Sequence, residues 1–237
     1  MRITVCPAIF QQFSSARIAV IAGWGLNNHQ TPPEVIELLR TAEEAVRSCY
    51  SLEELSSLGQ ITDWRDAYRT FGMKPSSYRS SIEALLRRVL QGKDLPSISP
   101  VVDLYNIVSL KHLLPAGAMN LDAIQGDVTL TVANGQERFI RLGGEAPENI
   151  QPGEVIYRDD DDVLCRAWNY RESEKSKITP SSRNVCLFLE GLDSTSTTNL
   201  VAAQTEMQEL LKTYCGGSYQ LGILSLSEPH IALGDPS

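Results

Sequence analysis

Side chains able to do chemistry are scattered along this sequence, and none belongs to a catalytic motif that stands on its own. There is no Gly-x-x-x-x-Gly-Lys phosphate loop, no Gly-x-Ser-x-Gly nucleophile elbow and no His-Glu-x-x-His zinc helix. Ser80 and Ser81 could serve as nucleophiles, but no histidine stands in a pattern that would activate them. We therefore interpret His29, His112 and His230 as ordinary surface or partly packed residues.

The sequence favours neither a metal site nor a cofactor. The five cysteines are odd in number, widely spaced and without a Cys-x-x-Cys pair, which is typical of buried free thiols. Four consecutive aspartates, Asp159 to Asp162, lack the glycine turn and the spaced glutamate of a calcium loop. We interpret them as a solvated turn that protects strand edges from pairing with other molecules.

The charge balance limits the ways in which this chain could bind nucleic acid. With 21 Lys and Arg against 29 Asp and Glu, the formal net charge is -8, which argues against a broad electrostatic surface for phosphates. Any RNA contact must then be local. A basic cluster could make that contact, although a charge run is usually just a solvated helix face; its members are Lys74, Arg79, Arg87, Arg88 and Lys93.

Length and hydropathy predict one compact unit over residues 1–237. No apolar run is long enough to span a bilayer, and the N-terminus has no charged segment followed by an apolar stretch and a cleavage site. A cytoplasmic location without a membrane partner is therefore the default expectation.

The best-specified element is a helix that starts at Ser80. Ser80 and Glu83 stand at capping-box spacing, and Gly92 is suited to end the helix. Its apolar face is predicted to comprise Ile82, Leu85, Leu86, Val89 and Leu90, with Arg87 and Arg88 on the other face. A second apolar run follows from Val101 to Leu114.

The N-terminal third is predicted to contain two strands and a helix. Residues 2–13 and 16–22 look like strands, the second being a continuous apolar run. A helix should begin at Thr31 and Pro32, with Thr31 as its cap, and end near Cys49. Residues 51–58 are expected to form a further short helical piece.

The remainder predicts hairpins, then a strand, a helix and a last strand. The alternation in 128–132, followed by Asn134-Gly135, indicates a hairpin with 137–142, and 153–157 should pair with 163–168. A buried strand over 184–189, a helix from about Thr198 to Gly216, and a strand over 219–225 complete the chain. The fold class is therefore α+β, with a mixed or antiparallel sheet.

Several of these segments together resemble a known module. They are Trp64, Tyr68, Phe71-Gly72, residues 75–81, Ile82-Glu83-Ala84-Leu85, Leu95-Pro96 and Val102-Asp103-Leu104-Tyr105-Asn106. This pattern resembles the B3/B4 region of the phenylalanyl-tRNA synthetase beta subunit, and more closely the free-standing proteins made of that region. The resemblance runs from about Arg17 to Gly217. In the synthetase this module is the editing domain, which hydrolyses tyrosine wrongly attached to phenylalanine tRNA.

The resemblance also implies a site. Glu190, in Leu189-Glu190-Gly191, looks like the acidic residue that lines the family's amino-acid pocket, although a surface carboxylate at a strand end would read the same way. Asp103 and Asn106 match the Val-Asp-x-x-Asn that borders the same cavity, and they could equally hold a helix start and a turn by hydrogen bonds. With Ser80, Ser81 and Gly117 they form the expected substrate-binding set.

Two departures from the family pattern bear on activity. Gly117 stands where the family has the histidine of the editing site, and something near Ala167-Trp168 replaces a glycine pair. Replacing glycines that admit a ligand close to the backbone must reshape the pocket. The expected function is a free-standing editing factor that hydrolyses mischarged tRNA by positioning water, with Glu190 as its catalytic residue. The alternative is a noncatalytic module that binds tRNA or an amino acid.

Overall fold

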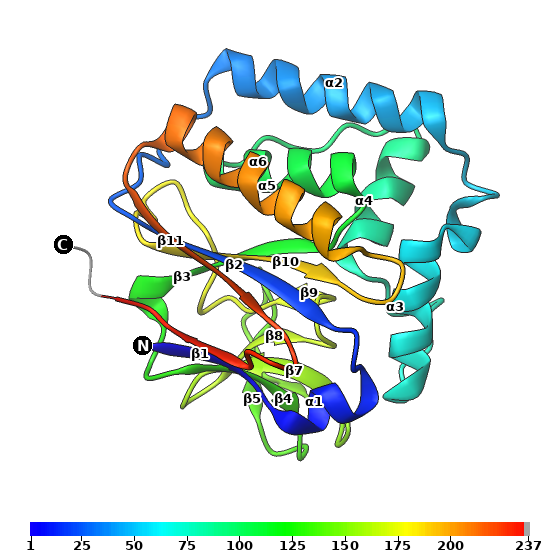
Figure 1. The fold of residues 1–237 in the computed structure, drawn as a ribbon, viewed down its shortest axis with the longest axis vertical. Helices are drawn as coiled ribbons and strands as arrows, with labels where there is room; N and C mark the ends of the chain where they lie inside the picture. The colour runs from blue at the N-terminus through cyan, green and yellow to red at the C-terminus, as the bar shows by residue number, and fades with distance from the viewer. Residues whose placement is uncertain (235–237) are drawn as a thin grey trace.

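The computed structural model describes residues 1–234, which form helices packed on two main β-sheets (Figure 1). The helices are α1 Pro7–Gln12, α2 Pro33–Cys49, α3 Gly59–Thr70, α4 Ser81–Leu90, α5 Pro100–His112 and α6 Thr197–Cys215, with 3-10 turns η1 Leu55–Ser57 and η2 Leu121–Ala123. The strands are β1 Arg2–Val5, β2 Arg17–Trp24, β3 Ala116–Asn120, β4 Val128–Val132, β5 Arg138–Phe139, β6 Glu148–Asn149, β7 Val155–Arg158, β8 Val163–Arg166, β9 Arg171–Glu172, β10 Val185–Gly191, β11 Ser218–Leu224 and β12 His230–Ala232.

The two sheets differ in their topology. An antiparallel four-stranded sheet has the order β11-β2-β10-β3, and a mixed six-stranded sheet has the order β12-β1-β4-β7-β8-β9, in which β1 and β4 are parallel. A small ribbon joins β5 to β6. The predicted α+β class with mixed and antiparallel pairing is therefore confirmed.

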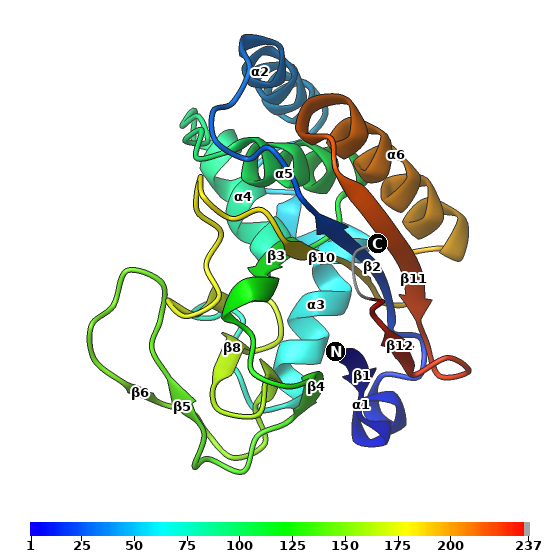
Figure 2. The ribbon, with the colours of Figure 1, turned by 90° about the vertical axis from the view of Figure 1, so that its left-hand side faces the viewer.

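The four-stranded sheet is the middle layer. Helices α2, α4, α5 and α6 lie together on one side of it, and the six-stranded sheet lies on the other, with the β5–β6 ribbon projecting away from the helices (Figures 1 and 2). Every residue of the central strand β10 is buried. A strand covered on both faces must be apolar along its whole length, which explains the continuous run Val-Cys-Leu-Phe-Leu and makes Glu190 conspicuous there.

Helix α4 begins as predicted. The Ser80 hydroxyl caps it by accepting a hydrogen bond from the Glu83 backbone amide, with donor and acceptor 3.4 Å apart. Gly92 ends the helical segment with a φ of 76°, a conformation that glycine adopts without strain. Local side-chain chemistry is thus enough to define this element.

The hairpin predicted around Asn134-Gly135 is wrong. Strand β4 pairs with β1 and β7 instead, and β5, in the expected partner segment, pairs with β6. Gly135 does make a turn with a φ of 88°, and the Glu137 carboxylate accepts hydrogen bonds from the amides of Asn134 and Gly135. Asn134-Gly135 therefore forms the predicted turn, but both edges of β4 are paired with other strands, β1 and β7. The second hairpin, β7 with β8, is confirmed.

Two N-terminal predictions also need correction. Residues 7–12 form helix α1 rather than a continued strand, because Pro7 stands in its first turn where a missing amide proton costs nothing. Thr31 does not cap α2: its hydroxyl donates to the Asp103 carboxylate at 2.7 Å, and α2 starts from Pro32 without a side-chain cap. The short helical piece predicted within residues 51–58 is confirmed in part, as the 3-10 turn η1 over Leu55–Ser57.

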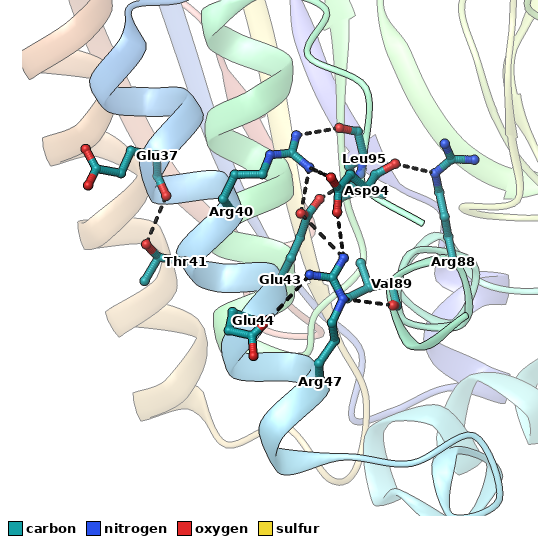
Figure 3. Close-up of polar contacts among 10 residues, drawn as sticks. All are labelled: Glu37, Arg40, Thr41, Glu43, Glu44, Arg47, Arg88, Val89, Asp94 and Leu95. Atoms are coloured by element: carbon teal, nitrogen blue, oxygen red, sulfur yellow. Dashed lines mark hydrogen bonds and ion pairs between the residues drawn. The ribbon is translucent and has the colours of Figure 1, made fainter. Parts of the chain in front are cut away.

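A buried carboxylate fixes α2 to the segment between α4 and α5 (Figure 3). Glu43 is fully buried, and it accepts hydrogen bonds from the Leu95 amide and from the Arg40 guanidinium, both at 2.6 Å. Arg47 of the same helix pairs with Asp94 at 2.7 Å. Since a buried charge must be paired, this network fixes the position of α2 relative to α4 and α5.

Candidate functional site

A cavity of about 390 Å³ opens where α4 and α5 meet the ends of both sheets. Its walls are mostly apolar, with a few polar groups that converge on the space. Its lining comprises Ser81, Ala84 and Leu85 of α4; Tyr105 and Asn106 of α5; residues 116–119 of β3; Arg141 and Leu142 beyond β5; Tyr157; residues 164, 165 and 168–172; and Phe188 and Glu190 of β10. An apolar pocket of this size with convergent polar groups is the usual form of a small-molecule site.

Four residues of the predicted set line this cavity, namely Ser81, Asn106, Gly117 and Glu190. Ser80 is instead the cap of α4. Asp103 is fully buried beneath the start of α5, where its carboxylate accepts hydrogen bonds from neighbouring hydroxyls and a backbone amide. The structure therefore gives Ser80 and Asp103 positions outside the lining and the other four a common space.

Glu190 is held rigidly by neutral donors. It is 3% exposed, and its carboxylate accepts hydrogen bonds from the Tyr157 hydroxyl at 2.5 Å, the Trp168 indole at 3.0 Å and the Asn169 amide at 2.7 Å. Burial raises the pKa of Glu190 to about 7, and the three hydrogen bonds oppose this rise. A carboxyl whose pKa lies near neutral pH can accept or donate a proton during catalysis.

Glu172 is a second carboxyl of the cavity, and sequence reasoning missed it. It ends the two-residue strand β9, in a polar stretch that carries no distinctive pattern. Burial of the carboxyl raises the pKa of Glu172 to about 7, and a hydrogen bond from the Ala118 backbone amide opposes this rise; the residue as a whole is partly buried. One carboxylate oxygen would lie 3.2 Å from a Cβ on Gly117, so Glu172 occupies the space beside the position where the resemblance expects a histidine.

The backbone at Ala167 and Trp168 is in the left-handed region. Their φ angles are 45° and 63°, and both residues are buried. This region carries a steric cost for every residue except glycine. At the two positions where the resemblance predicts glycines, the backbone thus has a conformation that glycine would adopt more easily than Ala167 and Trp168 do. The Trp168 ring stacks edge-on against Trp64 and Phe13, which directs its N–H toward Glu190.

The predicted basic cluster is only partly available to a ligand. Arg87 pairs with the buried Glu83 carboxylate at 2.9 Å, and Arg79 lies 3.9 Å from it. Arg88 donates to the Asp94 carbonyl but remains exposed, as do Lys74 and Lys93. The rim of the cavity itself carries two further exposed cations, Arg141 and Arg171, that sequence reasoning did not select.

The aspartate run is structured rather than merely solvated. Asp159 is buried; its carboxylate accepts hydrogen bonds from the amides of Gln125, Asp161 and Asp162, and pairs with Lys175 at 2.7 Å.

Within residues 1–234 no group of three or more His, Cys, Asp or Glu is placed to hold a metal ion. Over the same residues, no helix has both the length and the apolar character needed to cross a membrane.

Comparison with known proteins places the chain in a family. The family model described as B3/4 domain matches residues 63–216, so the chain belongs to the B3/4 domain family. It is 31% identical over 104 residues to the phenylalanine–tRNA ligase beta subunit of Chromobacterium violaceum, and 30% identical over 98 residues to that of Idiomarina loihiensis. These matches cover 44% and 41% of this chain, but only 13% and 12% of the two relatives.

A solved structure is also similar. It is an N-terminal fragment of the phenylalanyl-tRNA synthetase beta subunit from Pyrococcus horikoshii, with a TM-score of 0.48 and 13% sequence identity. The match covers 92% of this chain and 49% of the fragment.

Proposed function

We propose that this chain is a free-standing, cytoplasmic editing factor that hydrolyses the ester bond of mischarged tRNA. The observation that carries the proposal is Glu190, a buried carboxyl on the wall of an amino-acid-sized cavity. Asn106, Gly117 and Ser81 border the same space. Membership of the B3/4 domain family, together with the tRNA-ligase relatives, makes an aminoacyl group a reasonable occupant.

The proposed reaction needs only water and the substrate ester. The Glu190 carboxylate takes a proton from a water molecule as the water oxygen attacks the ester carbonyl carbon. The bond from that carbon to the ribose oxygen then breaks, the ribose oxygen takes up the proton that Glu190 removed from water, and the free amino acid leaves. Tyr157, Trp168 and Asn169 orient the carboxylate, so it needs no reorganisation as the reaction proceeds.

The acceptor end of tRNA would approach over the cavity rim. Arg141 and Arg171 stand there, and the exposed Lys74, Arg88 and Lys93 extend the positive surface. Arg79 and Arg87 belong to the expected tRNA-binding set as well, although part of their charge is neutralised by Glu83. Local contacts of this kind fit a protein whose net charge is -8.

The test is incubation with a panel of mischarged tRNAs. Wild-type protein should release the amino acid from at least one of them faster than buffer does. Glu190→Gln should abolish that release, whereas Glu209→Gln, which removes an exposed carboxylate on α6, should not. If no tRNA in the panel is deacylated, the enzymatic proposal is wrong.

A noncatalytic binding module is the second candidate, and Gly117 is the observation that favours it. Where the resemblance expects the histidine of the editing site, this chain has no side chain at all. A binder would form a salt-sensitive tRNA complex, or show a rise in melting temperature with an amino acid, without any turnover.

A further inference from the structure

The two carboxyls of the cavity differ in their hydrogen bonding. Glu190 accepts hydrogen bonds from three side chains, whereas the donor to Glu172 is the Ala118 backbone amide. Glu172 also faces Gly117, which has no side chain to fill the space between them. Gly117 pairs with Phe188 in the sheet, so its missing side chain would point to the same face as those of Phe188 and Glu190. The Glu172 carboxylate therefore stands at the cavity face of the four-stranded sheet.

Among residues 1–234, no cation pairs with either of these acids, although Arg141 and Arg171 stand at the rim of the cavity. In the part of the chain that the structure describes, no Lys, Arg or His nitrogen lies within 4.0 Å of either carboxylate. The two arginines at the rim are engaged elsewhere: Arg141 pairs with Glu148 at 3.1 Å, and the Arg171 guanidinium stacks over Tyr170 at 4.9 Å. Buried acids are normally paired with a positive charge, so a positively charged group of a ligand could supply the missing partner in this site.

An independent observation also indicates a polar ligand. The Ser81 hydroxyl oxygen is buried at the cavity wall and has no hydrogen-bond partner among residues 1–234. Buried polar atoms without a partner are rare in folded proteins and often mark a place where a ligand or water completes the bonding. Ser81 and Glu172 thus supply acceptor capacity to a space that is otherwise lined mainly by apolar groups.

We propose that Glu172 binds the protonated amino group of the ligand and so restricts the site to molecules whose amine is free. Resting on the proposed function, this names the substrate class: aminoacyl esters with an unmodified amino group are accepted, and N-acylated or peptidyl esters are rejected. An ammonium group presents three donors, which suits the Glu172 carboxylate and leaves a bond for Ser81. An acylated nitrogen loses the charge and meets an uncompensated acid instead.

Binding of small amides tests this proposal without any tRNA. The probes are a panel of L-amino acid amides and their N-acetyl derivatives. Like the ester, an amide has no free carboxylate. Binding is measured by isothermal titration calorimetry at pH 8. At least one amide should bind, and its N-acetyl form should bind tenfold or more weakly. Glu172→Gln should weaken binding of that amide by about 10-fold to 100-fold, the usual value of a charged hydrogen bond.

Controls separate recognition from folding. Glu209→Gln, which removes a charge on α6 far from the lining, should leave amide binding unchanged. The comparison of amide and N-acetyl amide uses wild-type protein and holds even if Glu172→Gln does not fold. Equal binding of the two probes, unchanged binding by a folded Glu172→Gln, or no amide binding at all would each overturn the proposal. Failure of tRNA deacylation, by contrast, bears only on the proposed function.

Discussion

The Glu172 carboxylate lies 3.2 Å from the point that a Cβ on Gly117 would occupy, so the side chains at these two positions share one space. A methyl group at position 117 would need only a small shift of a flexible side chain. A ring would need the whole carboxylate to leave. The glycine at 117 and the glutamate at 172 are therefore best understood as a coupled pair, and they can be tested as one.

Gly117→His should destabilise the protein by about 1–3 kcal/mol, because the new side chain would crowd the Glu172 carboxylate oxygen that lies 3.2 Å from the Cβ position. Adding Glu172→Gly should recover most of that loss, because the imidazole can then occupy the vacated space. Urea unfolding of both single variants and the double variant completes the cycle. Purely additive losses would mean that the two positions do not compete.

Stability should fall as the pH rises through neutrality, and Glu190 should be a main cause. Its pKa in the folded state, about 7, lies above the unfolded value of about 4.3, so the folded state holds the proton more tightly. That contribution is fully present below the unfolded pKa and is lost as the pH rises through the folded pKa. It amounts to about 4 kcal/mol at most. Glu190→Gln should flatten unfolding free energies measured from pH 4 to 8, and an unchanged slope would contradict the assignment.

Local chemistry was enough to predict some elements and not others. The Ser80 cap and Gly92 define α4 within a dozen residues, so the sequence signal and the structure agree. Strand β4 carries an equally clear alternation, yet its neighbours β1 and β7 come from distant parts of the chain. Pairing of that kind depends on the tertiary fold, which a turn signal at Asn134-Gly135 cannot reveal.

The site shows the same division. Glu190 could be selected from sequence only because the family resemblance gave it a role, since on its own it looks like a carboxylate at the end of a strand; the structure places it inside the buried strand β10. Glu172 lies on a two-residue strand among other polar residues, and only the approach of β9 to β3 makes it part of a cavity. Its environment is created by packing, so residue type and spacing could not have identified it.

Glu43→Ala should cost about 3 kcal/mol or more, since it leaves the Leu95 amide unsatisfied and Arg40 without its buried partner. Glu44→Ala is the matched control. The Glu44 side chain is 71% exposed, and its contact with Arg47 is a long one of 3.6 Å. Its loss should therefore cost less than 1 kcal/mol. Chemical unfolding measures both variants, and similar losses would show that the Glu43 network does not fix α2.

Substitution of Arg87 should affect stability, whereas substitution of Arg88 should affect tRNA binding. Arg87→Ala should lower the melting temperature, because Glu83 is buried and would keep only its longer contacts with Arg65 and Arg79. Arg88→Ala should leave stability nearly unchanged and weaken any tRNA complex, with a smaller salt dependence. The sequence pattern groups both arginines in one basic cluster, whereas their contacts in the structure predict different effects; thermal melting with tRNA titration checks this.

Trp168→Phe should raise the pKa of Glu190 above its wild-type value. The indole N–H stabilises the ionised carboxylate, and phenylalanine keeps an aromatic ring while removing that donor. The midpoint of the pH-dependent fall in stability should then move upward, and so should the midpoint of any deacylation that needs ionised Glu190. Trp64→Phe is the control, because Trp64 packs edge-on against the same indole with ring centroids 5.0 Å apart. It should lower stability at every pH without moving the midpoint, whereas equal midpoints in the two variants would mean that the Trp168 hydrogen bond does not tune Glu190.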